Sequence, residues 1–150
     1  MSEAIFILFG VLTAIGVLLV SYPTYLYIRL KMHEKKVKEV YLQLKTQVDF
    51  KCELASNVNN KELEKVILEY TKDKKENYNL DLKYYNEIFN KYIYAYSSES
   101  NIVKCNESEE KINHVKDYYN EVVSSYNSFK SNKVTAYLSK SFLINDGKLY

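Results

Sequence analysis

Side chains that could perform catalysis or bind a metal are few and scattered in this sequence. The chain has two histidines, His33 and His114, and two cysteines, Cys52 and Cys105. Glu110 and His114 are four residues apart, whereas helical di-iron sites use a Glu-x-x-His motif in which the two ligands are three apart. Cys52 has no histidine near it in the sequence and falls on an apolar stripe, so a nucleophilic site is not indicated. We therefore predict no catalytic residue, no metal site and no cofactor.

Glycine and proline are rare after the first 23 residues. Between Thr24 and Lys148 there is no proline and a single glycine, Gly147. This composition excludes a glycine-rich phosphate loop and favours long helices joined by short polar loops over tight hairpins. The same region holds all 21 Lys and Arg and, apart from Glu3, all of the 19 acidic residues. Because the two signs nearly balance, we expect no nucleic acid among the partners.

The start of the chain is strongly apolar. Residues 4–20 read AIFILFGVLTAIGVLLV, in which Thr13 is the one polar side chain. With Ser21 and Tyr22 the segment has about 19 residues and would form a helix roughly 28 Å long, close to the thickness of a bilayer's hydrocarbon core. Residues 1–23 are therefore predicted to be a single-pass transmembrane anchor. The alternative is a cleaved signal peptide, which would need a cationic start and a small-residue cleavage site that MSE and SYPTY do not supply.

Basic residues follow the apolar segment closely, and none precedes it. They are Arg29, Lys31, Lys35, Lys36 and Lys38. The positive-inside rule then predicts a cell-membrane protein with its N-terminus outside and its larger C-terminal part in the cytoplasm. The same side chains could contact anionic headgroups, so the lipid bilayer is the first predicted partner.

Residues 24–131 are predicted to form an antiparallel bundle of about four helices, which makes the chain all-α. Between residues 37 and 58 the apolar positions advance by three or four, the spacing of one helical stripe. This pattern predicts a helix over residues 24–58 that continues from the transmembrane segment with a kink at Pro23.

Three more helices and a tail are expected after it. The second helix begins at Asn59 or Asn60, the third covers residues 80–96, and the last begins at Asn106 or Ser108. A polar loop over 97–104 separates the third helix from the last. An irregular tail over 132–150 follows, with a short helix around 134–138. Apolar residues in the last helix alternate steps of three and four, which favours antiparallel packing against the first.

Two of these segments resemble the LemA family. Residues 37–58, VKEVYLQLKTQVDFKCELASNV, are similar to the family's first conserved helix, and residues 109–127, EEKINHVKDYYNEVVSSYN, to its last. The matching positions are Tyr41, Gln43, Gln47, Leu54, Asn57, Glu109, Ile112, Tyr119, Asn120, Val123, Tyr126 and Asn127. The chain departs from the family where Phe50 and Lys51 replace paired arginines and Ser56 replaces a proline.

The resemblance implies a membrane-tethered helical bundle, but it brings no defined biochemical activity. We therefore expect a non-enzymatic interaction or scaffold module that binds a protein partner or copies of itself. An alternative is an adaptor for the envelope stress response or for membrane proteolysis.

Shared polar residues in the first and last helices suggest a structural role. Gln43 and Gln47 are one turn apart, and Asn120 and Asn127 are two turns apart. Our hypothesis is that they meet between the two helices and set the helix register through buried hydrogen bonds. The alternative is that they are ordinary surface positions.

Overall fold

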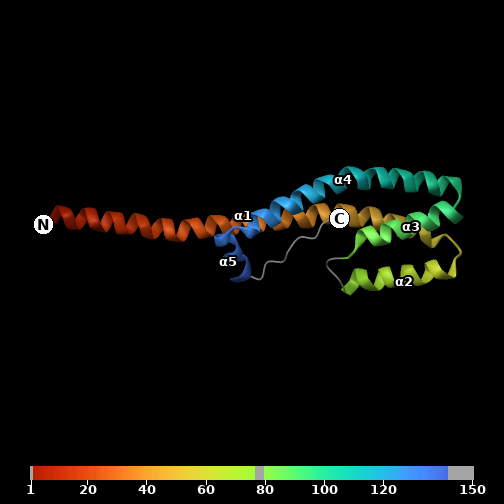
Figure 1. Ribbon diagram of the computed structural model, residues 1–150, viewed down its shortest axis with the longest axis horizontal. Coiled ribbons are helices and arrows are strands. Elements are labelled where there is room, and N and C mark those ends of the chain that lie inside the picture. The colour runs from red at the N-terminus through yellow and green to blue at the C-terminus, as the bar shows by residue number, and fades with distance from the viewer. Residues whose placement is uncertain (1, 77–79, 142–150) are drawn as a thin grey trace.

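The computed structural model describes residues 2–76 and 80–141, and within these ranges it contains helices and no strand. The described helices are α1 (Ser2–Ser56), α2 (Lys61–Glu76), α3 (Leu82–Tyr96), α4 (Glu99–Ser131) and α5 (Lys133–Ser141). Figure 1 shows α1 running almost the whole length of the molecule, with the other helices gathered along its C-terminal part. The predicted all-α class is confirmed.

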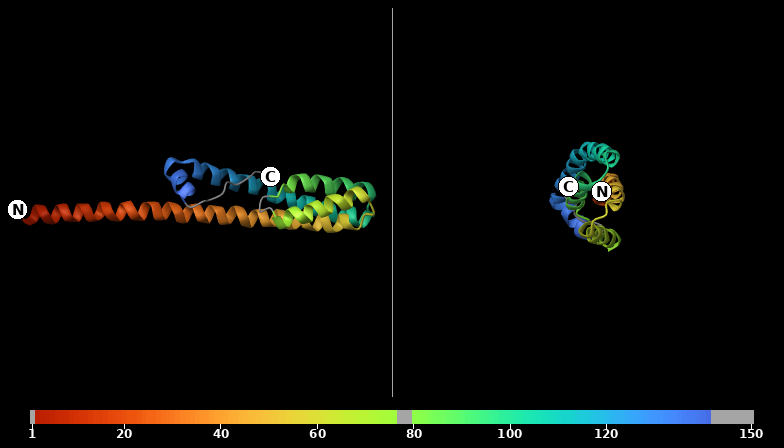
Figure 2. Two further views of the ribbon diagram at one scale, coloured as in Figure 1. Left: turned by 90° about the horizontal axis from the view of Figure 1, so that it is seen from below. Right: turned by 90° about the vertical axis from the view of Figure 1, so that its right-hand side faces the viewer.

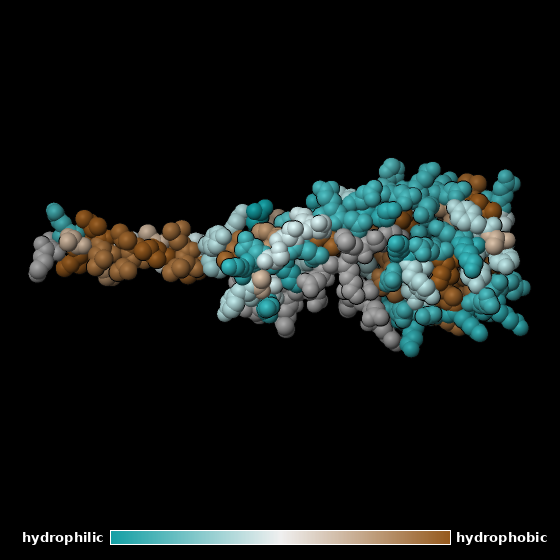
Figure 3. Space-filling model, viewed as in Figure 1, coloured by the Kyte–Doolittle hydropathy of each residue, from teal (hydrophilic) through white to brown (hydrophobic). Residues whose placement is uncertain are grey.

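The N-terminal part of α1 is apolar, and no other described helix lies beside it. Its side chains are exposed as far as Tyr22, and Leu26 and Leu30 are the first that the other helices bury. Thr13 donates its hydroxyl hydrogen to the Phe9 carbonyl at 2.8 Å, so this polar atom is satisfied within the helix. Figure 3 shows the projecting segment as a continuous apolar surface. Among the described residues, α1 alone is long and apolar enough to cross a membrane.

The C-terminal part of α1 is the centre of the bundle. The apolar stripe expected between residues 37 and 58 is confirmed, with these members buried: Val37, Val40, Leu44, Val48, Ala55 and Val58. Opposite this stripe, α4 runs back along α1 and contributes Ile112, Tyr119 and Val123 to the core. The first and last long helices therefore pack antiparallel, as the heptad-like spacing predicted.

The starts of α2 and α3 are set by side-chain caps. The Asn60 side chain accepts hydrogen bonds from the backbone N–H groups of Glu62 and Leu63 at 2.9 and 3.1 Å, which confirms the predicted start of α2. Asp81 accepts from the N–H of Tyr84 at 3.0 Å, so α3 begins two residues later than expected.

The polar loop predicted over residues 97–104 is wrong. The chain turns at Ser97 and Ser98, and α4 begins at Glu99. The polar residues in this stretch form the outer surface of the first turns of α4, whereas Cys105 and Ser108 are buried on its inner face. The proposed cap at Asn106 or Ser108 is therefore wrong as well.

The C-terminal tail begins with a helix that is longer than expected. The predicted short helix around 134–138 is present as α5 (Lys133–Ser141), and the rest of the predicted tail, 142–150, lies outside the described residues. α5 packs against both α1 and α4. In Figures 1 and 2 it turns across α1 at the end of the bundle that faces the apolar segment.

Candidate functional site

A buried lysine lies at the junction of α1, α3 and α4. Lys51 is 0% exposed, and its ammonium group donates to the side-chain oxygens of Asn86 and Asn90, both at 2.8 Å. It also forms a short ion pair with the carboxylate of Glu109 on α4. A lysine ammonium has three donor hydrogens, so these three partners satisfy it completely.

The two asparagines close the network around this ion pair. Asn86 and Asn90 are one turn apart on α3 and therefore lie on the same helix face. Their amide nitrogens donate to the Glu109 carboxylate at 3.3 and 2.9 Å. The Cys105 thiol donates to the Asn90 oxygen at 3.2 Å. Asn86 and Asn90 therefore bond to both members of the ion pair, and the network joins α1, α3 and α4.

The surroundings of Glu109 keep its carboxyl group ionised. Partial burial acts to raise its pKa, but the hydrogen bonds and charge of Lys51 and the amides of Asn90 and Asn86 outweigh burial and hold the pKa below 4.5. The Cys105 thiol has a raised pKa because it is buried, so it stays protonated at neutral pH. The arrangement is therefore a buried ion pair, with no spare donor on Lys51 to offer a substrate.

This electrostatic arrangement predicts a loss of stability in acid. Because the pKa of Glu109 is lower in the folded protein than the unfolded value of about 4.5, its contribution to stability is complete above that value and is lost as the pH falls below it. We expect the urea midpoint of the purified protein to fall more steeply between about pH 5 and pH 3 for the natural chain than for Glu109→Gln, which cannot titrate at this position. Equal slopes would show that Glu109 has the same pKa in both states.

A second group of contacts fixes α2 against α1 and α3. The Tyr70 hydroxyl donates to Asp49 at 2.6 Å, and Lys74 pairs with the same carboxylate at 2.7 Å. Burial, followed by the hydrogen bond to Asp49, raises the pKa of Tyr70. The Tyr70 ring meets the rings of Tyr85 and Phe89 edge-on, with centroids 4.9 and 5.4 Å apart. This cluster therefore connects α2 to α1 and α3.

Some of the predicted motif residues lie between α1 and other helices. Tyr41 accepts a hydrogen bond from the backbone N–H of Leu80 at 3.0 Å, and its ring centroid is 6.3 Å from that of Tyr119. Gln47 reaches α4, where its side-chain oxygen accepts from the Ser108 hydroxyl at 3.2 Å. The structure therefore brings Tyr41, Tyr119 and Gln47 to the interface between the first and last long helices.

The other motif residues are more peripheral. Gln43 and Asn57 are exposed, and the Asn57 amide donates to the Glu53 carbonyl near the end of α1 at 3.3 Å. Asn120 and Asn127 are half-buried, and Tyr126 is buried. The exposed Gln43 does not form the predicted buried hydrogen bond, and that Gln47, Asn120 and Asn127 set the register stays a prediction.

Sequence reasoning did not identify the buried network, although the sequence holds a signal for it. Lys51 lies between Val48 and Ala55 on the apolar stripe of α1, where a charge requires a partner. Asn86 and Asn90 likewise interrupt an apolar face of α3. Polar residues of complementary type on two apolar faces point to a buried network, but the sequence does not show that they meet.

The predicted membrane-proximal basic residues, Arg29, Lys31, Lys35, Lys36 and Lys38, are all exposed on α1. Lys31 and Lys38 pair with Glu34 at 2.8 and 3.0 Å. Arg29 lies beside the Tyr25 and Phe129 rings, at 5.7 and 5.8 Å from their centroids. This surface therefore keeps a net positive charge next to the apolar segment.

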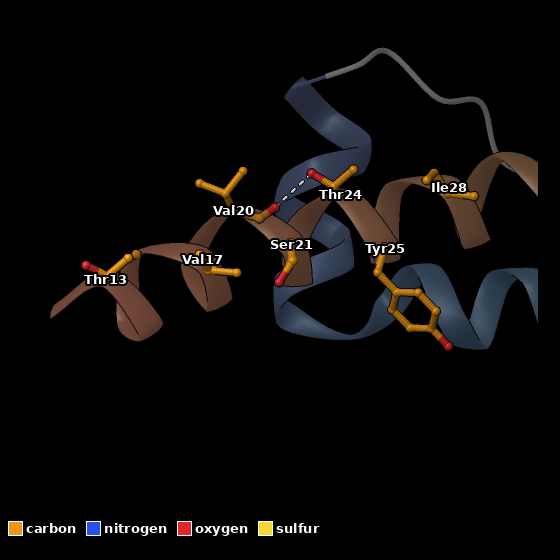
Figure 4. A pocket seen from close by; sticks show the side chains of 8 residues that line it. Thr13, Val17, Val20, Ser21, Thr24, Tyr25 and Ile28 are labelled. Carbon is orange, nitrogen blue, oxygen red and sulfur yellow. Dashed lines mark hydrogen bonds between the residues drawn. The ribbon is translucent and has the colours of Figure 1, made fainter. Parts of the chain in front are cut away.

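The apolar segment also carries a shallow groove, shown in Figure 4. It is lined along one face of α1 by Thr13, Gly16, Val17, Val20, Ser21, Thr24, Tyr25 and Ile28. Apart from the neighbouring backbone of α1 itself, a Cβ added at Gly16 would meet nothing within 4 Å, so the groove opens outward from the helix. The hydroxyls of Thr13 and Thr24 donate back to carbonyls of α1, both at 2.8 Å, so neither donor hydrogen is directed at a ligand.

Within residues 2–76 and 80–141, no three His, Cys, Asp or Glu side chains are grouped so that they could hold a metal ion. The buried ion pair is the most developed polar site in this part of the chain. No family model, curated protein or solved structure matches this chain.

Proposed function

We propose that this chain is a single-pass membrane protein whose helical bundle is a non-enzymatic interaction or scaffold module. The observation that carries the proposal is the continuity of α1, which extends from the apolar segment into the core of the bundle. Anchor and bundle share one hydrogen-bonded helix, so they cannot rotate independently as two domains on a flexible linker would.

This geometry suits a protein that holds a binding surface at a fixed distance from a membrane. From Ser21 to the end of α1 at Ser56 the helix is roughly 50 Å long at its normal rise per residue. The bundle lies along this stretch, and exposed tyrosines, among them Tyr94 and Tyr96, lie on α3. We propose that this part of the bundle binds a protein partner or a second copy of the chain.

The LemA-like identity is part of this proposal. The resemblance places an acid at Glu109 and one of two arginines at Lys51. In this chain the two positions pair inside the bundle. We propose that a basic residue at position 51 serves to join the helices, which would explain why a single lysine can stand where the family has an arginine pair.

The proposed orientation, with the bundle in the cytoplasm, can be tested by cysteine labelling. In a Cys52→Ala, Cys105→Ser background, single cysteines would replace Ser2 near the N-terminus and the exposed Ser100 near the start of α4. On intact cells a membrane-impermeant maleimide should label residue 2 only, and both positions after permeabilisation. Labelling of residue 100 alone on intact cells would place the bundle outside.

The anchor and the scaffold role need separate measurements. The protein should stay in the membrane pellet after washing with alkaline carbonate, whereas release into the supernatant would contradict a transmembrane helix. A photo-crosslinking amino acid at Tyr94 or Tyr96 should then capture a protein or a second copy in living cells, with Lys35 on α1 as the comparison position. Failure to capture anything from either tyrosine would contradict an interaction surface on α3.

A further inference from the structure

The helix α5 buries polar side chains and exposes apolar ones, which is the reverse of a helix on the surface of a soluble protein. Its small polar residues Thr135 and Ser139 are 1% and 3% exposed, whereas Val134 and Tyr137 are 43% and 74% exposed. The Ser139 hydroxyl donates to the Ala136 carbonyl at 2.9 Å, so backbone groups satisfy it. An amphipathic helix in water normally buries its apolar side chains and exposes the polar ones.

The position of α5 suggests what covers this exposed face. In Figures 1 and 2 it turns across α1 at the end of the bundle nearest the apolar segment. Figure 4 shows it passing behind the part of α1 that includes Ser21 and Thr24. If α1 crosses a bilayer, α5 lies at the depth where the apolar segment ends and runs across α1, parallel to the membrane surface. This places it in the headgroup layer, which extends several Å beyond the hydrocarbon core.

The charges around α5 match an anionic lipid surface. Lys133 and Lys140 are exposed on the helix, and no acidic residue occurs from Val122 to Ser141. On α1 no acid occurs from Ala4 to His33. Burial lowers the pKa of His33, and the nearby positive charges of Arg29 and Lys36 lower it further. Glu34 is the nearest acid along α1, and it already pairs with Lys31 and Lys38.

From this placement we infer that α5 is an interfacial helix, which rests on the same membrane that α1 crosses. Val134 and Tyr137 lie against lipid, while Lys133 and Lys140 contact anionic headgroups. This inference rests on the proposed membrane anchor and adds a second contact with the bilayer. Because α5 also packs on α1 and α4, that contact would brace the bundle against tilting about the apolar segment.

The chain contains no tryptophan, so a single Tyr137→Trp substitution introduces a unique fluorescent reporter. The full chain would be reconstituted in vesicles of phosphatidylcholine and phosphatidylglycerol, with and without bromine atoms on the acyl chains. Leu68→Trp is the matched control, because Leu68 is also exposed, at 70%, and belongs to α2, which lies away from the apolar segment and outside the proposed interaction surface on α3. Flotation of the vesicles is measured in every sample.

In the Tyr137→Trp variant we expect brominated lipid to remove about half of the indole emission, because an interfacial helix lies within reach of the upper acyl chains. This variant should also emit at shorter wavelength than Leu68→Trp. The control indole at position 68 should be unaffected by bromine and accessible to aqueous iodide.

Three outcomes would overturn the inference in different ways. Floating protein in which iodide but not bromine quenches the indole at position 137 would exclude the interfacial helix and leave the anchor intact. Floating protein in which neither quencher reaches position 137 would also exclude it, because a protein surface would then cover α5. Protein that does not float would overturn the anchor itself, and the inference with it.

Discussion

Exchanging Glu109 for leucine should lower the free energy of unfolding by about 3–5 kcal/mol, because removing one partner of a buried ion pair leaves the other charge uncompensated. The remaining partner is Lys51, whose side chain is 0% exposed. Lys51→Met should cost less, since it leaves behind a Glu109 side chain that is 30% exposed. The order of the two single variants therefore tests which charge is the more deeply buried.

The double variant Lys51→Met, Glu109→Leu separates the loss of the pair from the cost of an orphan charge. Replacing a whole buried ion pair with apolar residues is often close to neutral. We therefore expect the double variant to be more stable than Glu109→Leu alone. Asn86 and Asn90 would remain in the core and would lose their charged partners, so recovery should be incomplete.

These energies can be measured by urea unfolding of the full chain in mild detergent, followed by circular dichroism at 222 nm. The matched control is Lys35→Met on the same helix, because Lys35 and Glu39 form an exposed pair at 3.7 Å. That substitution should change stability by less than about 1 kcal/mol. If Glu109→Leu were no more costly than this control, the buried network would contribute nothing to the fold.

The parts of the fold that could be predicted are those determined by residues close together in the sequence. The stripe that includes Leu44 and Val48 predicted the buried face of α1 because a helix repeats its faces every three to four residues. The cap at Asn60 could also be predicted, because its hydrogen bonds reach only two and three residues along the chain. The start of α4 was missed because the polar residues after Ser98 suit a helix surface as well as a loop, and composition alone does not distinguish the two.

The candidate site was harder to predict because its parts are far apart in the sequence. Lys51, Asn86 and Glu109 belong to three helices and meet only after those helices pack. The positions of Lys51 and Asn86 on apolar faces indicate that each needs a polar partner, but not which residue that partner is. Helical spacing shows which face a residue occupies, but the identity of its partner depends on how far each helix is shifted along its neighbours.

The aromatic cluster between α2 and α3 should show the second large effect on stability. Phe89 is 0% exposed, and its ring packs against those of Tyr70 and Tyr85, with centroids 5.4 and 6.2 Å away. Phe89→Ala removes most of a buried aromatic side chain and leaves a cavity, so it should cost about 3–5 kcal/mol. Phe89→Leu keeps more of the volume and should cost clearly less.

The same cluster should also determine which helix loosens first. α2 meets the rest of the bundle through Leu63, the Tyr70 ring and the contacts of Asp49, so a cavity at position 89 removes a main support of this helix. Hydrogen exchange of Phe89→Ala should therefore rise in α2 and α3 before it rises in α4, which keeps its long contact with α1. Leu68→Ala on α2 is the control, because Leu68 is 70% exposed and its loss should leave exchange unchanged. A uniform rise across all helices in Phe89→Ala would instead mean that the bundle opens as one cooperative unit.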